Sequence, residues 1–379
     1  MSYKALCEQP RPPASLSKLK NVANPWIRKP LSRFCRPRPN GRQKENIFEG
    51  LSVNTTTHIL LATYQGAEHL PEQLHSIEQQ TFCHWHLWAR DDGSTDATRN
   101  ILQAFAHRHP DRTTLLEGQG GGAARNFWAL LQAVQPRTDH DLFAFCDQDD
   151  VWLSDKLERA VHWHTHQSGP ATANLYCART QVTDAQLRPL YLSPRPRRPL
   201  TLCNALVENI ASGNTMVLNV PLLQAMKRIA ADNMVLHDWS AYLAATACGG
   251  KVHFDPHPCL LYRQHSANVV GARKGLLQRA QRLGRLMKGG YRAWGDATEG
   301  ALRDLAPLLT AESKGIARSF AAARHSTLAV YNVSTTPCVR GSPANADRRS
   351  GLFGWPCYWV WFRAACTRWV SLLCYAASL

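Results

Sequence analysis

Short apolar runs alternate with helical stretches between residues 58 and 166, and this alternation restricts the fold more than any other feature. The runs are HILLATY, WHLWAR, TTLL and LFAFC. Between them, apolar residues recur at the three- and four-residue spacing of an amphipathic helix. Apolar runs with polar boundaries are typical of strands that are buried on both faces. Their alternation with helices predicts βαβ units and a doubly wound, mostly parallel sheet, which is an α/β fold.

Polar side chains stand where these predicted strands end. Asp91 and Asp92 follow the second run, Asp147 and Asp149 follow the fourth, and Thr63 closes the first. In doubly wound sheets, ligands bind beyond the carboxyl ends of the strands. We therefore take these five residues as the first candidates for a site.

The segment DQDD contains a D-x-D pair, Asp147 and Asp149. Two carboxylates at this spacing in an extended turn point the same way and can share one Mg²⁺ or Mn²⁺ ion. Such an ion neutralises a nucleotide diphosphate as it leaves. A helix-capping turn has the same composition, so the pair needs support from other motifs.

The segment RDDGSTDAT follows the second predicted strand. Gly93 permits a tight turn, and Ser94 or Thr95 is placed to cap the next helix. Asp91 or Asp92 can then reach a base edge or a ribose hydroxyl. A capped turn without any ligand is the alternative.

Three further segments carry candidate groups. Asp238 in LHDW opens a predicted helix, either as a general base towards a hydroxyl or as an ordinary helix cap. In YRQHSANVVG, Arg263 is a candidate for a diphosphate and His265 for an additional metal ligand. The Gly-rich stretch GQGGG lacks the Lys-Ser/Thr of a P-loop, but it brings Arg125 and Asn126 towards a nucleotide.

The basic charge is unevenly distributed. A net charge of +16 over 379 residues suggests an anionic partner. Residues 1–50 hold 11 Lys/Arg against 3 Asp/Glu, residues 273–379 hold 16 against 5, and the residues between hold 17 against 20. Nucleic-acid-binding folds usually carry their positive surface on the folded domain. We therefore expect no nucleic-acid partner.

Composition divides the chain into four parts. Residues 1–52 are rich in Pro and Arg and predict a disordered basic arm, and 53–275 form the α/β domain. Residues 276–325 predict a basic helical extension. Residues 326–379 are rich in Cys and Trp, and two interpretations stay open: a membrane-associated amphipathic segment, or sequence that is not native. The 12 cysteines, without CxxC pairs or an export signal, predict a cytoplasmic protein.

The order of the motifs resembles the family 2 glycosyltransferases of the GT-A fold. ILLATYQG, RDDGSTDAT and FAFCDQDDVWLSDKL carry this resemblance, which covers about residues 57–275. SGNTMVLN, LHDW and YRQHSANVVG are similar to a bacterial rhamnosyltransferase-like subgroup. The resemblance implies a Rossmann-like, mostly parallel sheet flanked by helices, with a helical C-terminal extension.

The resemblance also implies roles for individual residues. It implies an inverting transfer of a sugar, with rhamnose as one candidate, from a nucleotide-diphosphate donor to an acceptor hydroxyl in bacterial surface glycan synthesis. Asp238 matches the catalytic base, and Asp149 matches the metal ligand, with Asp147 supporting it or touching the ribose. The matches to nucleotide-binding positions are Thr63, Tyr64 and Asp92, with Asp91 beside them. Gly213 and Asn214 fall where the donor sugar and acceptor bind, and His265 falls where some members place a metal or diphosphate ligand.

Gln65 departs from the family pattern, which usually has Asn after the Thr-Tyr pair. The expected acceptor is a glycan or lipid-linked glycan, reached by peripheral association with the inner face of the membrane. The alternative from another class is a non-catalytic basic protein that binds nucleic acid or membrane through a degenerate sugar-nucleotide fold. A nucleotidyltransferase is a second alternative, but its Gly-rich, Lys-containing triphosphate loop does not occur in the sequence.

Overall fold

The computed structural model describes residues 55–118, 120–167, 172–264 and 290–325. The predicted arm and the Cys/Trp-rich tail lie outside the described residues. The same holds for His265 and for the first part of the predicted helical extension.

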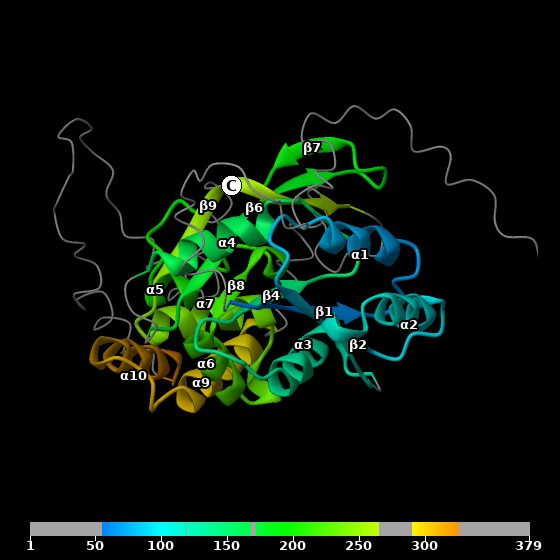
Figure 1. Cartoon of the computed structure of the whole chain (residues 1–379). Coiled ribbons are helices and arrows are strands. Elements are labelled where there is room, and N and C mark those ends of the chain that lie inside the picture. Colours follow the sequence, from blue (N-terminus) through cyan, green and yellow to red (C-terminus); the bar gives the residue numbers. More distant parts are fainter. Residues whose placement is uncertain (1–54, 119, 168–171, 265–289, 326–379) are drawn as a thin grey trace, which may run out of the picture. The chain divides into compact units, whose positions relative to one another are not determined.

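Parallel strands joined by helices form the first half of the sheet, in the order β3-β2-β1-β4. Figure 1 labels β2, β1 and β4 of this half with the helices α1, α2 and α3. The predicted strands and helices are confirmed here. Every residue of β1 except Ala62 is buried, as expected of a strand covered on both faces. The elements are β1 (Thr57–Thr63), α1 (Leu70–Glu78), β2 (Trp85–Asp91), α2 (Thr98–Arg108), η1 (Pro110–Arg112), β3 (Thr113–Leu116), α3 (Gly122–Ala133) and β4 (Leu142–Cys146).

Antiparallel strands join the sheet beyond β4. β8 runs antiparallel to β4 and to β6, whereas β6 and β9 are parallel. The expected α/β class is confirmed, and these pairings are an addition to the expected parallel order. The elements of this half are β5 (Val151–Trp152), α4 (Lys156–Thr165), β6 (Leu175–Thr183), β7 (Pro189–Leu192), α5 (Leu202–Ala205), η2 (Gly213–Thr215), β8 (Val217–Asn219), α6 (Val220–Arg228), η3 (Ala231–Asn233), α7 (His237–Ala247) and β9 (Val252–Arg263).

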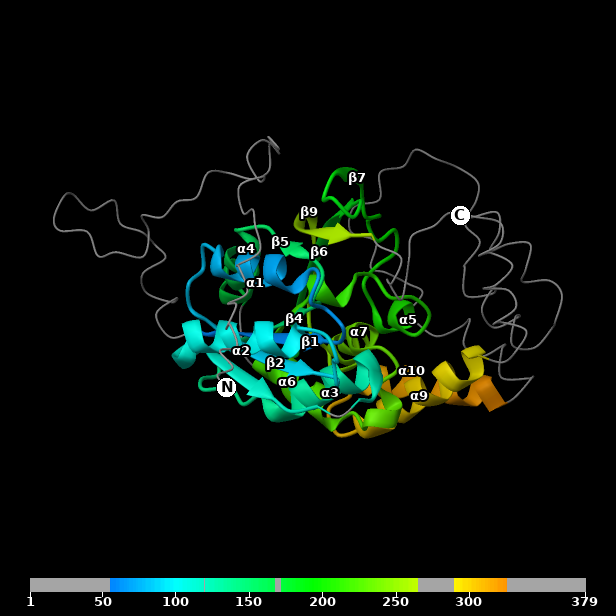
Figure 2. The same ribbon diagram turned by 90° about the vertical axis from the view of Figure 1, so that its right-hand side faces the viewer.

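Helices cover both faces of the sheet, and each face has its own apolar core. α1, α2 and α4 pack on one face, and α3, α6 and α7 pack on the other (Figure 2). Two further helices, α9 (Gly290–Asp304) and α10 (Ala311–His325), contribute Leu302, Ile316 and Phe320 to the second core. The described part of the predicted helical extension is therefore helical and packs against α7.

The predicted cap of α2 is wrong. The helix begins at Thr98, and neither Ser94 nor Thr95 caps it. Ser94 instead donates its hydroxyl hydrogen bond to Asp91, at 2.5 Å. Asp96 accepts a hydrogen bond from the backbone N–H of Thr98 at 3.0 Å. The carboxylate of Asp96 therefore satisfies an N–H group at the start of α2, which is the role expected of Ser94.

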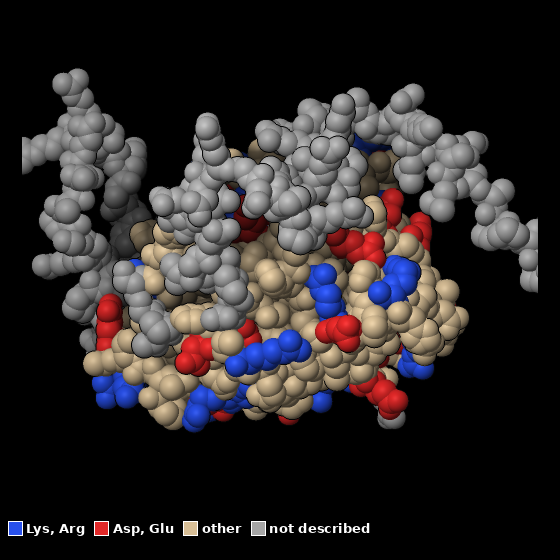
Figure 3. Space-filling model, viewed as in Figure 1, with Lys and Arg blue, Asp and Glu red and all other residues tan. Residues whose placement is uncertain are grey.

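Charged side chains of both signs are mixed on the surface. On the face shown in Figure 3, Lys and Arg lie among Asp and Glu over the described residues. This agrees with the near balance of charges counted for the central part of the chain. Among the helices of the described residues, none is both long and apolar enough to cross a bilayer.

Candidate active site

An acidic cluster lies beyond the end of β4. Asp147, Asp149 and Asp150 follow this strand, and Asp238 enters from the first turn of α7. Burial raises the pKa of Asp147 to about 7, and the negative charges of Asp149 and Asp238 add to the shift. Residues about 90 positions apart in sequence thus repel one another. The structure brings together the predicted metal pair and the predicted base.

The donor chemistry of this cluster fits a divalent cation. Hard cations prefer carboxylate oxygens, and a bound cation would relieve the repulsion around Asp147. Among the described residues, no group of three or more His, Cys, Asp or Glu side chains is arranged to hold a metal. The metal-ligand roles of Asp147, Asp149 and His265 therefore stay predictions.

Asp150 lies behind the D-x-D pair and is almost completely buried. Burial, reinforced by the charge of Asp149, raises its pKa well above the usual range. Asn214, in η2, donates its amide hydrogen bond to the Asp150 carboxylate. Asn214 is also fully buried, so the structure places it as a support of the acidic loop, and its predicted contact with the sugar stays a prediction.

Gly213 leaves room for the base. A Cβ atom at this position would overlap the His237 ring and lie 3.1 Å from Cβ of Asp238. The His237 ring stacks on Phe127 with 3.7 Å between centroids, and burial lowers its pKa to about 4. His237 is therefore neutral near pH 7, and its ring lies between Gly213 of η2 and Phe127 of α3.

Thr63 and Asp91 are joined where β1 and β2 end. The Thr63 hydroxyl donates to the Asp91 carboxylate at 3.0 Å, and Arg99 donates to the same carboxylate at 2.9 Å. Burial opposes ionisation of Asp91, but hydrogen bonds from Ser94, Arg99 and Thr63 lower its pKa. Asp91 is thus ionised, and its hydrogen bonds hold Thr63 and Ser94 in place at the predicted nucleotide site.

Asp92 joins the end of β2 to the start of α3. Its carboxylate accepts from the backbone N–H of Gly122 at 2.7 Å. Asn126 donates to the carbonyls of Thr63 and Arg90, so it supports the strand ends from below. Arg125 behaves differently, because its guanidinium pairs with Asp232 at 2.7 Å on the surface. Asp92 and Asn126 therefore lie next to Thr63, whereas the Arg125 side chain points to Asp232 in η3.

Gln148 is a site residue that the sequence analysis missed. Its side-chain oxygen accepts from the backbone N–H of Tyr64 at 2.8 Å, and its amide donates to the Tyr64 carbonyl at 2.9 Å. The middle residue of the D-x-D pair thus fixes the loop after β1. The Tyr64 side chain itself is 57% exposed, which leaves its ring available to a nucleotide.

Gln65 adopts a left-handed backbone conformation with φ of 51°. Asn tolerates this region better than Gln, which gives a physical reason for the usual Asn at this position. The Gln65 amide compensates by donating to the Thr95 hydroxyl at 2.9 Å. The departure from the family pattern is therefore accommodated within the loop.

Arg263, at the end of β9, is 4% exposed and contacts three parts of the chain. It donates to the Asp149 carbonyl at 3.1 Å, to the Ala185 carbonyl at 2.6 Å and to the Glu72 carboxylate. These contacts make Arg263 a brace of the D-x-D loop. Its predicted contact with a diphosphate stays a prediction.

Lys156 is a buried cation that the sequence analysis also missed. Its side chain is fully buried, and its Nζ lies 3.0 Å from the centroid of the Trp152 ring. Burial lowers its pKa to about 8. Its positive charge in turn lowers the pKa of Asp147. The sequence KL at the start of a helix reads as a surface lysine, so no local signal could have revealed this role.

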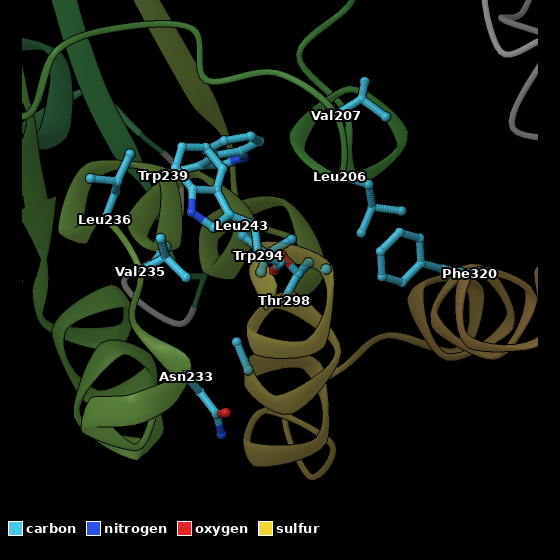
Figure 4. A pocket seen from close by; sticks show the side chains of 13 residues that line it. Leu206, Val207, Asn233, Val235, Leu236, Trp239, Leu243, Trp294, Thr298 and Phe320 are labelled. Carbon is cyan, nitrogen blue, oxygen red and sulfur yellow. Dashed lines mark hydrogen bonds between the residues drawn. The ribbon is translucent and has the colours of Figure 1, made fainter. Parts of the chain in front are cut away.

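An apolar pocket lies beside the helix that carries Asp238 (Figure 4). Leu236, Trp239 and Leu243 line it from α7 and the residue before it, and Trp294 and Phe320 line it from α9 and α10. The rings of Trp239 and Trp294 meet edge to face at 5.5 Å. The lining comes from segments far apart in sequence, so periodicity could not predict it.

Residues 58–223 match the model of a family described as Glycosyl transferase family 2. The chain is 30% identical over 240 residues to the dTDP-rhamnosyl transferase RfbG of Shigella flexneri, which covers 61% of this chain and 81% of that protein. It is 29% identical over 103 residues to the UDP-Glc:alpha-D-GlcNAc-diphosphoundecaprenol beta-1,3-glucosyltransferase WfgD of Escherichia coli, covering 27% of this chain and 38% of that protein.

Solved structures are also similar to this chain. The structure of S. aureus TarS residues 1–349 in complex with UDP-GlcNAc superposes with a TM-score of 0.44 and 14% sequence identity. The match covers 71% of this chain and 87% of that one.

Proposed function

The chain belongs to glycosyl transferase family 2, and from this premise we propose that it moves a sugar from a nucleotide-diphosphate donor to an acceptor hydroxyl, inverting the anomeric carbon. The similarity to a dTDP-rhamnosyl transferase supports dTDP-rhamnose as the first donor to test. Family membership sets aside the alternative of a non-catalytic basic binding protein.

The observation that carries the proposal is the placement of Asp147 and Asp149 after β4 with Asp238 of α7 near them, close enough for its charge to raise the pKa of Asp147. In the proposed reaction, Asp238 takes the proton of the acceptor hydroxyl, whose oxygen forms a bond to the anomeric carbon as the bond to the diphosphate oxygen breaks. Asp147 and Asp149 would hold a divalent cation, which when bound neutralises the departing diphosphate. Attack opposite the leaving group inverts the anomeric centre without a covalent intermediate.

The remaining predicted residues serve binding in this proposal. Thr63, Tyr64 and Asp92 hold the nucleotide, and Asp91 braces them through Thr63. Gly213, whose missing side chain lets the His237 ring pack beside Asp238, is proposed to line the donor-sugar and acceptor site.

The proposed acceptor is a glycan or lipid-linked glycan of bacterial surface polysaccharide assembly. The name of the Escherichia coli relative, which includes a diphosphoundecaprenol-linked sugar, supports a lipid-linked acceptor. We place the protein in the cytoplasm, at the inner face of the membrane, since nucleotide sugars and such acceptors meet there.

The decisive experiment separates donor binding from transfer. A screen of nucleotide sugars by thermal shift with Mn²⁺ or Mg²⁺ identifies the donor, because a ligand of the folded state raises its stability. The Asp149→Ala variant is expected to lose the metal-dependent shift. The Asp238→Asn variant is expected to keep that shift and to lose transfer by about 10²- to 10⁴-fold.

Asp111→Asn is the matched control, because Asp111 is an exposed acid on η1. It is expected to keep both binding and transfer. Transfer at the unsubstituted rate by Asp238→Asn would remove that residue from the base role. A product with retained anomeric configuration by NMR would reject the inverting mechanism.

A further inference from the structure

β7 and the residues that follow it form a ribbon with an unusual surface. Leu190, Tyr191 and Leu192 are 55%, 42% and 40% exposed, although they are consecutive apolar residues in a strand. We call residues 188–198 the β7 ribbon. Figures 1 and 2 both show β7 beyond the rest of the sheet, attached through β6.

Both faces of this ribbon are open to solvent. Successive side chains of a strand point to opposite faces, so an ordinary edge strand would bury every second residue. In β7 three neighbouring side chains are exposed, so neither face packs on a core built by the described residues. A protein partner usually covers one face of a strand. The headgroup region of a bilayer surrounds an inserted ribbon on both faces. It therefore suits this arrangement better than a protein partner does.

Arginines flank the exposed apolar side chains. Arg195, Arg197 and Arg198 follow β7 and are exposed, and Arg188 precedes it. Residues 185–207 contain no Asp or Glu, and the neighbouring Asp184 pairs with Arg188 at 2.8 Å. Apolar and aromatic side chains next to Arg are the composition of segments that bind anionic membrane surfaces. The charge complements anionic phospholipid headgroups.

The β7 ribbon is tied to the acidic cluster. Arg263 donates one hydrogen bond to the Asp149 carbonyl and another to the Ala185 carbonyl, at the start of the turn that leads into β7. Four residues span at most about 14 Å, so Pro189 lies within that distance of Ala185. A membrane bound by the ribbon would therefore lie close to the site that receives the acceptor.

We propose that the β7 ribbon inserts Leu190, Tyr191 and Leu192 into the headgroup region of an anionic membrane and so holds the acidic cluster beside a lipid-linked acceptor. This inference rests on the proposed function. It assigns membrane contact to the catalytic domain, in contrast to the basic flanks to which the charge distribution pointed. Pairing with a second copy is disfavoured, because Pro189 and the irregular register at Val182 and Thr183 weaken this edge.

The test uses the full chain and vesicles of phosphatidylcholine with and without phosphatidylglycerol, in a sedimentation assay. We expect binding to the phosphatidylglycerol vesicles. The double variant Leu190→Ser/Leu192→Ser should bind at least about tenfold more weakly. In Arg195→Ser/Arg197→Ser, each lost arginine should cost about fivefold at low salt. Leu308→Ser and Arg318→Ser are the matched controls, because both residues are exposed and belong to α10 or the turn before it, which Figures 1 and 2 show apart from β7.

Three outcomes would overturn the inference: no binding of the full chain to anionic vesicles, ribbon variants that bind like the unsubstituted chain, or a dimer in light scattering that the ribbon variants dissociate without vesicle binding. The nucleotide-induced thermal shift is measured in parallel. The ribbon variants should keep it, since their side chains are exposed. Its absence from the unsubstituted chain would count against the proposed function, whatever the vesicles show.

Discussion

At the scale of single residues, the site depends on groups that do no chemistry themselves. Gly213 leaves space for the neutral His237 ring, which stacks on Phe127 next to Asp238, and Gln148 fixes the backbone of Tyr64. The positive charge of Lys156 lowers the pKa of Asp147 in the acidic cluster. Each of these contributions can be removed by one substitution while the proposed reacting groups remain.

We predict that Gly213→Ala lowers transfer at least about 10²-fold, because a displacement of about 1 Å in the base is enough for such a loss. The added methyl would overlap His237 and press on Asp238. Steady-state kinetics would check this. Gly315→Ala in α10 is the control, since its Cβ meets no atom within 4 Å, and it should raise stability by about 0.5–1 kcal/mol without loss of transfer. Equal activity of both variants would show that the space at 213 is not needed.

We predict that Lys156→Met weakens Mg²⁺ binding about tenfold at about pH 7 and has little effect at about pH 9. Lys156 lowers the pKa of Asp147, so its loss raises that pKa above about 7 and lets a proton compete with the cation. At the higher pH, Lys156, with a pKa of about 8, is itself mostly neutral, so its removal changes the charge around Asp147 little. Calorimetric titration across this range would measure the difference. Lys251→Met, at an exposed lysine, is the control and should leave the pH dependence of Mg²⁺ affinity unchanged. If Lys156→Met changed the Mg²⁺ affinity by the same factor at every pH, the prediction would be contradicted.

At the scale of elements, α4, β6 and β9 are joined by one carboxylate. Asp255 in β9 accepts from Arg159 of α4 at 2.7 Å and from the Tyr176 hydroxyl of β6 at 2.6 Å. Burial opposes ionisation, but hydrogen bonds from Tyr176, His257 and Arg159 lower the pKa of Asp255 to about 2. The parallel pair β6 and β9 is thus attached to α4 through an ionised side chain.

We predict that Asp255→Asn lowers the free energy of unfolding by about 2 kcal/mol at neutral pH and by almost nothing near pH 2. A carboxyl with a lowered pKa in the folded state stabilises the fold above its unfolded pKa of about 3.9, and this contribution is lost as the pH falls through its folded pKa. Urea unfolding at several pH values would show the converging curves. Asp139→Asn, at an exposed acid, should shift little at any pH. If Asp255→Asn lowered the free energy of unfolding by the same amount at every pH, the charge of Asp255 would not be what stabilises these elements.

At the scale of the whole molecule, α9 and α10 are part of the same packed unit as α7. Leu305 is fully buried in the core that also contains Tyr242 and Met226. Asp304 accepts hydrogen bonds from the Ala230 N–H at 2.9 Å and from Asn233 at 2.8 Å, so polar contacts reinforce the packing. The helices that line the pocket next to Asp238 are therefore also required for stability.

We predict that Leu305→Ala lowers the free energy of unfolding by about 2–5 kcal/mol, because it leaves a cavity in this shared core. Since α9, α10 and α7 share the core, circular dichroism and tryptophan fluorescence should show one transition that moves as a whole. Leu308→Ala is the control, because Leu308 is 41% exposed, and it should change stability by less than about 0.5 kcal/mol. A separate early transition in Leu305→Ala would show that the two helices unfold independently.

The sequence by itself determined the first half of the fold and where in it the candidate site lies. Apolar runs of the right length specify buried strands, and the carboxyl ends of parallel strands meet at one edge, so Thr63, Asp91 and Asp147 could be placed together from local patterns. The motif order also predicted that Asp238 belongs with them, although 89 positions separate it from Asp149.

Tertiary structure alone decided what surrounds these groups. The burial of Lys156, the brace formed by Arg263 and the double contact of Gln148 with Tyr64 all depend on partners far away in the chain. The same is true of the antiparallel strands beyond β4 and of the exposed ribbon at β7. A sequence pattern reports the period of an element and the side chains it carries. Which element covers it, and how much water is left around each charge, is set by packing between distant segments.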